Sequence, residues 1–84
     1  MYIVYRIGEP VQTCRSSQEA YDVAMKFIIN YFGIVSEEVE QLTKSYENNP
    51  RDFGVMGYVW VQKLKVGDLV WTIINGLLIM EIVV

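Results

Sequence analysis

The chain has 84 residues, 52% of them hydrophobic and 20% charged, and its net charge at pH 7 is −3. This length predicts a single domain over residues 1–84, and the high apolar fraction excludes an intrinsically disordered chain. The seven Lys and Arg residues are scattered singly, whereas nucleic-acid binding needs clustered cations that displace counterions from phosphates. We therefore expect no nucleic-acid partner.

The sequence offers few residues for catalytic or metal chemistry. It has no histidine and one cysteine, Cys14, so it lacks both a histidine base and the ligands of a cysteine-rich zinc site. A single cysteine cannot form an internal disulfide, and the first ten residues lack the basic lead of a signal peptide. We expect a cytoplasmic protein that is not an enzyme, with no catalytic residue, cofactor or metal.

The first elements in chain order are a strand and two helices. Residues 2–7 (YIVYRI) predict a strand, and a turn at residues 8–10 leads to a short return strand at 11–13. Pro10 confines that return to a sheet edge or to the start of a strand, because proline cannot donate to the ladder.

Both helices have start and stop signals. Ser16 and Glu19 fit a capping box, and Gly33 is well placed to end the first helix. Ser36 opens a second helix that ends at residues 48–50 (NNP). The acidic run at 36–40 (SEEVE) lies in its first turn, where carboxylates favour the positive end of the helix dipole, so the run needs no ligand to explain it.

The apolar end of the sequence predicts a hairpin. The charge-free run at residues 69–80 is shorter than the 18–20 residues of a bilayer-spanning helix, so we expect no membrane partner. Asn75-Gly76 at its centre favours a type I′ turn. This predicts strands at 69–74 and 77–82, with Ile74 opposite Leu77.

A third strand at 58–64 precedes this hairpin, and residues 54–57 (GVMG) are interpreted as a flexible approach to it. The predicted fold is α+β: a strand with a short return, two helices, and a three-stranded antiparallel meander with both helices on one face. Alternation predicts that the face under the helices carries Tyr58, Trp60, Gln62, Leu64, Leu69, Trp71, Ile73, Leu78, Met80, Ile82 and Val84.

The opposite face of this meander is more apolar than a solvated sheet face should be. Either the N-terminal strands cover it or another chain does. The predicted interface consists of Val59, Val61, Thr72, Ile74, Leu77 and Ile79.

The leading functional hypothesis is a small protein-interaction module that forms a homodimer through the outer sheet face or binds another protein. Its small size and acidic composition are also typical of accessory proteins of phages and mobile elements. The alternative is a small-molecule-binding domain with a pocket between the helices and the sheet near Tyr46, Trp60 and Gln62. An enzyme that acts through carboxylates and tyrosine is the third hypothesis.

Overall fold

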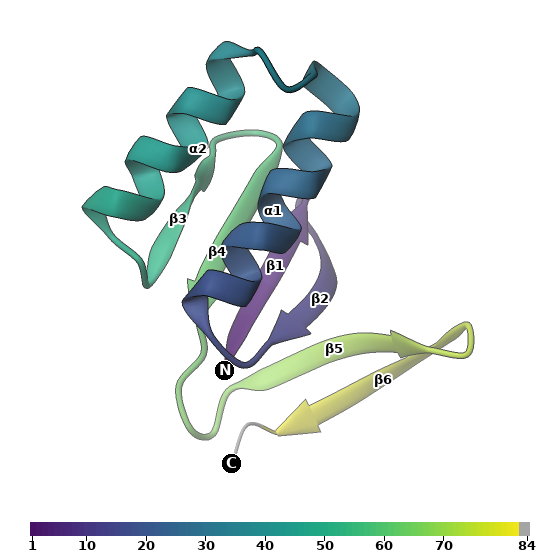
Figure 1. Cartoon of the computed structure of the whole chain (residues 1–84). Helices are drawn as coiled ribbons and strands as arrows, with labels where there is room; N and C mark the ends of the chain where they lie inside the picture. The colour runs from purple at the N-terminus through teal and green to yellow at the C-terminus, as the bar shows by residue number, and fades with distance from the viewer. Residues whose placement is uncertain (83–84) are drawn as a thin grey trace.

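The computed structural model describes residues 1–82, and it describes only the backbone of 69–74 and 78–82 (Figure 1). Six strands and two helices follow one another along the chain. Their bounds are β1 Tyr2–Arg6, β2 Glu9–Cys14, α1 Ser17–Phe32, α2 Glu37–Asn48, β3 Asp52–Val55, β4 Val59–Lys63, β5 Leu69–Ile74 and β6 Leu77–Ile82.

The main layer is a four-stranded antiparallel sheet in the order β2-β1-β4-β3. Both helices cover one face of this sheet (Figure 1). The predicted α+β class, the N-terminal hairpin and the shared helical face are therefore confirmed. The predicted three-stranded meander is wrong, because β4 pairs with β1 and β3 and not with β5.

The orientation predicted for β4 is also wrong. Val59 and Val61 lie in the core beneath the helices. Trp60, which lies between them in the strand, projects from the opposite face of the sheet, which we call the open face. The strand is apolar on both sides, so alternation separates its two faces without showing which one is buried. Strand β1 pairs with β4 and β2 pairs with β1, so the N-terminal strands extend the same sheet and do not fold across β4.

Strand β3 lies where the sequence indicated a flexible approach. It has only four residues, and Gly54 gives it a low intrinsic strand preference. It forms because Gly54 allows a close approach to β4: a Cβ at this position would lie 2.3 Å from the Val59 carbonyl oxygen and 2.8 Å from Trp60 Cα.

The main core lies between the sheet and the two helices, and a smaller cluster on the other side of the sheet holds the buried Ile3 with Tyr5 and Leu64. Helix α1 contributes one small or medium apolar residue per turn, and α2 contributes Leu42. Each fully buried aliphatic or aromatic side chain stabilises the fold by about 1.5–3 kcal/mol. The largest of them are Phe53, Ile28, Leu42, Val4, Val59 and Val61.

The predicted helix ends are confirmed. The Glu19 backbone N–H donates to Ser16 Oγ at 3.1 Å, and the Val39 N–H donates to Ser36 Oγ at 3.3 Å. The Gly33 N–H donates to the Ile29 carbonyl, and its φ of 96° explains the glycine there. Local hydrogen bonds thus fix both helix starts.

Two tight hairpin turns have the same backbone form. Asn75 and Gly76 have φ of 53° and 78°, and Ile7 and Gly8 have φ of 51° and 79°. Both residues of each turn have positive φ, as in a type I′ turn. The Ile7-Gly8 turn begins one residue earlier than the turn predicted at residues 8–10. Pro10 lies in the edge strand β2, as expected.

The β5–β6 hairpin forms a two-stranded sheet of its own and passes beside β2 (Figure 1). Its register is the predicted one, from Ile74 opposite Leu77 to Leu69 opposite Ile82. The side chains assigned to the apolar face on this hairpin lie outside the described residues, as does Val84 altogether.

Candidate functional site

The structure divides the six predicted interface residues into two groups. Val59 and Val61 are buried beneath the helices, so they cannot belong to an exposed surface. The other four lie on the hairpin, where they form two neighbouring cross-strand pairs, Thr72 with Ile79 and Ile74 with Leu77. Only Leu77 among them has a described side chain, and it is 67% exposed.

The residues predicted to line a small-molecule pocket, Tyr46, Trp60 and Gln62, do not lie on one side of the sheet. Tyr46 packs in that layer against Tyr21 and Phe53, with ring centroids 4.4 and 4.8 Å away. Trp60 and Gln62 belong to the open face, on the other side of β4. The three residues proposed to line one pocket are therefore separated by the sheet.

Trp60 is fixed on the open face of the sheet. Its ring lies against Gly54, where a Cβ would be 2.9 Å from Trp60 Cε3. Its indole N–H donates to the Asp52 carboxylate. Both contacts come from β3, so they hold the end of the edge strand against β4.

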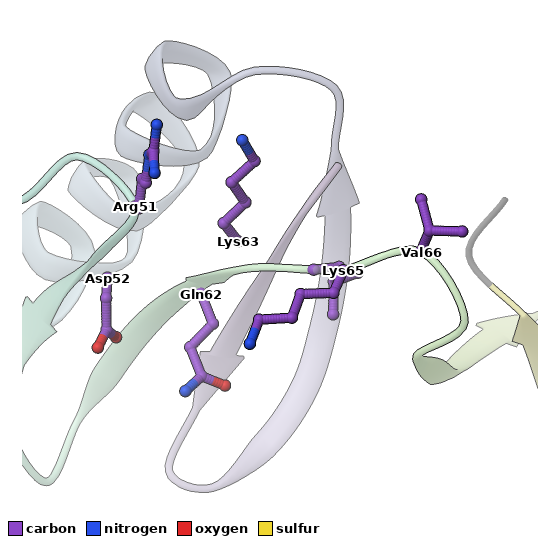
Figure 2. Close-up of a pocket in the computed structure, with 7 residues that line it drawn as sticks. Arg51, Asp52, Gln62, Lys63, Lys65 and Val66 are labelled. Atoms are coloured by element: carbon purple, nitrogen blue, oxygen red, sulfur yellow. The ribbon is translucent and has the colours of Figure 1, made fainter.

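A groove of about 520 Å³ opens at the end of β3 and β4 (Figure 2). Figure 2 shows Arg51 and Lys63 projecting to one side of β4, whereas Gln62 and Lys65 lie on its other side. Because the three cations do not converge on one point, this arrangement is not a site for a single anion. Its lining residues are Arg51, Asp52, Gln62, Lys63, Leu64, Lys65 and Val66.

The loops and turns at the end of the sheet away from the hairpin (Figure 1) carry most of the exposed large apolar residues. Six of the ten large apolar side chains exposed in the described part of the chain belong to segments that meet there. They come from the β1–β2 turn, the end of α1, the α1–α2 loop and the β3–β4 turn. We call this surface the apolar end: Ile7, Tyr31, Phe32, Ile34, Val35 and Met56.

Direct contacts join three of these segments, and the fourth, the α1–α2 loop, follows the end of α1 in the chain. The Tyr58 ring lies 5.0 Å from the rings of both Tyr31 and Phe32. The Ile7 backbone N–H donates to the Tyr58 carbonyl at 2.6 Å. Tyr58 thus links the β1–β2 turn to the last turn of α1, and the apolar end has a fixed base.

A second groove, of about 420 Å³, runs from this end onto the open face. It lies between the Ile7-Gly8 turn and Gly57, and one side chain of a partner could enter it. Its lining residues are Tyr5, Ile7, Gly8, Gly57, Tyr58, Val59 and Trp60.

The apolar end was not predicted from the sequence, although one signal for it is visible there. Ile34 and Val35 lie between the glycine that ends one helix and the serine that begins the next. Apolar residues in such a loop belong to no helical stripe. Tyr31 and Phe32 directly precede this loop in the sequence, whereas Ile7 and Met56 come close to it only in the folded chain.

Cys14 is the single cysteine of the chain, and it is buried. Burial, with a smaller effect of the Glu19 charge, raises the pKa of the Cys14 thiol, so it is a poor nucleophile. No group of three or more possible metal ligands occurs among the described residues. Within the same part of the chain, neither helix combines the length and the apolar character needed to cross a membrane.

Comparison with known proteins adds no relative: no family model, no curated protein and no solved structure matches this chain.

Proposed function

We propose that the protein is a small self-associating interaction module, in which the β5–β6 hairpin forms the contact between two copies. The supporting observation is the isolation of this hairpin. Within residues 1–82, β5 and β6 pair only with each other, so β6 has no strand on its other edge. An edge strand of six residues with free backbone N–H and C=O groups is a template for pairing with another chain.

The hairpin sequence supports the same function. Ten of its twelve strand residues are apolar, the exceptions being Thr72 and Glu81. A two-stranded ribbon has two faces, and its own domain can cover only one of them. By register, one face here is apolar throughout and the other carries four apolar residues. An isolated hairpin is at best marginally stable in water, so the second face needs a partner.

A second copy of the chain is the partner that fits most directly. It presents an identical apolar strand, and antiparallel pairing of β6 with β6 across a twofold axis would satisfy both free edges with one contact. The pairing would join two hairpins into one four-stranded intermolecular sheet.

Light scattering on wild type and an Ile79→Lys variant tests this proposal. Ile79 lies opposite Thr72 in the register, and a charge there should convert a dimeric wild type into a monomer. Leu77→Lys should weaken the dimer without unfolding the domain, because Leu77 is largely exposed.

Val35→Lys is the matched control. It places the same charge on an exposed apolar residue remote from the hairpin, and it should leave the dimer intact. A monomeric wild type, or a dimer that tolerates both hairpin substitutions, would show that the hairpin is not a self-association surface.

A further inference from the structure

The exposure of the apolar end is extreme for single side chains. Val35 is 96% exposed, Met56 88% and Ile34 71%. Scattered exposed apolar residues are normal on a soluble protein, whereas a contiguous group of them marks an interaction site. Here the group comes from three separate stretches of the chain, at 7, 31–35 and 56, so a single accidental loop residue does not explain it.

Backbone strain at Ile7 points to the same surface. Ile7 has a φ of 51°, a conformation that a β-branched residue rarely adopts, and its side chain is mostly in water. The equivalent position of the other hairpin holds Asn75, the residue type that such a turn favours. Neither local conformation nor burial explains an isoleucine at this position, but contact with a partner does.

The charges around the apolar end are predominantly negative. Glu37 and Glu38 directly follow the α1–α2 loop, and Glu9 directly follows the Ile7-Gly8 turn. Glu40, one turn further into α2, is already paired with Lys44 at 2.9 Å. The nearby cation is Arg6, whose guanidinium carbon lies 5.2 Å from the centre of the Phe27 ring.

This charge pattern decides among possible partners. A symmetric contact with a second copy would bring the same carboxylates face to face, and an anionic membrane surface would repel them. A protein segment with cations beside its apolar residues would satisfy both features of the surface.

We propose that the apolar end binds an amphipathic segment of another protein, with an apolar stripe flanked by Lys or Arg. One side chain of the stripe enters the groove between the Ile7-Gly8 turn and Gly57, and the rest cover Val35 and Met56. The flanking cations face Glu37 and Glu38. This partner is distinct from the second copy proposed to bind the hairpin, and neither proposal depends on the other.

Fluorescence anisotropy with two labelled synthetic helices tests the proposal. Both helices carry leucine at positions i, i+3, i+4 and i+7, and the flanking residues are lysine in one and glutamate in the other. We expect the lysine helix to bind at least tenfold more tightly than the glutamate helix, with an affinity that falls as salt is raised. The double variant Val35→Ser/Met56→Ser should weaken that binding at least tenfold, and Glu37→Gln/Glu38→Gln should reduce the preference for lysine.

Val66→Ser is the control, because Val66 is an equally exposed apolar residue in the β4–β5 connection, and it should bind the lysine helix as wild type does. All of these substitutions lie at exposed positions except Glu38, which is half-buried, and unchanged thermal midpoints will confirm that the fold is intact. Equal binding of the two helices, or equal binding by wild type and the Val35/Met56 variant, would overturn the proposal. Co-sedimentation with phosphatidylserine vesicles that is lost in that variant would assign the surface to a membrane, and loss of the dimer in Val35→Lys would assign it to a second copy.

Discussion

Replacement of Ile7 by asparagine should stabilise the protein, although it removes an apolar side chain. The reason is the turn that Ile7 forms with Gly8, in which both residues have positive φ. A left-handed conformation costs an ordinary L-residue about 1–2 kcal/mol, and asparagine bears much less of that cost because its short polar side chain can bond locally.

The loss that opposes this gain is small. The Ile7 side chain is 67% exposed, so only about a third of its surface is buried. Full burial of an isoleucine contributes about 1.5–3 kcal/mol, and a third of that is about 0.5–1 kcal/mol. The net expectation is a stabilisation of about 0.5–1 kcal/mol. For a chain of this length it corresponds to a thermal midpoint about 3–6 °C higher.

Thermal and urea unfolding followed by circular dichroism would measure this change, at one protein concentration because self-association makes the midpoint concentration-dependent. Ile7→Val is the matched control: it keeps the β-branch and the strain, so it should gain nothing. An asparagine variant no more stable than wild type would refute the reasoning, since it would mean that Ile7 bears no conformational cost. The same substitution removes part of the apolar end, so higher stability should accompany weaker binding of the lysine helix.

Three further outcomes follow from the core and the caps. Gly54→Ala should destabilise the protein by about 3 kcal/mol, because its Cβ would overlap the β4 backbone. Gly57→Ala has open space around it and should cost only about 1 kcal/mol. Similar unfolding midpoints for the two variants would argue against a close approach of β3 to β4. Ser16→Ala should cost about 1 kcal/mol in urea unfolding, through loss of the helix cap. At pH 8 the Cys14 thiol should react with a disulfide reagent far more slowly in the folded protein than in urea, and comparable rates would contradict its raised pKa. Because the folded pKa is the higher one, the stability linked to this thiol is fully present below pH 9 and is lost as the pH rises further.

Local signals predicted the helices and the hairpin turn correctly. A serine cap, a terminating glycine and an Asn-Gly pair each act through hydrogen bonds or backbone angles within a few residues. The environment elsewhere in the fold does not change them, so the sequence alone was sufficient.

Strand partners could not be predicted in the same way. The connection from Lys65 to Asp68 is a real turn, in which the Lys65 N–H donates to the Asp68 carboxylate at 2.7 Å. Consecutive strands joined by such a turn usually pair, but here β4 instead lies between β1 and β3. Burial of Val59 and Val61 between the helices and the sheet decided that arrangement, and it depends on segments distant in the chain.

The candidate surfaces also differ in whether local sequence or distant contacts determine them. The register of the hairpin was predicted correctly because it is set locally, whereas the β4 residues of the predicted interface were assigned to the wrong side of the sheet. The apolar end joins residues from four segments and so required the fold.

The central position of β1 also constrains how the chain can fold during synthesis. Its neighbour β4 lies more than fifty residues further along the chain, and the two strands pair from Tyr2 with Lys63 to Arg6 with Val59. Closing so long a loop is slow, and on the ribosome it must wait until β4 has left the exit tunnel. Until then the first hairpin has one edge without its strand, and the nascent chain would be most vulnerable to chaperone capture or misassembly at its beginning.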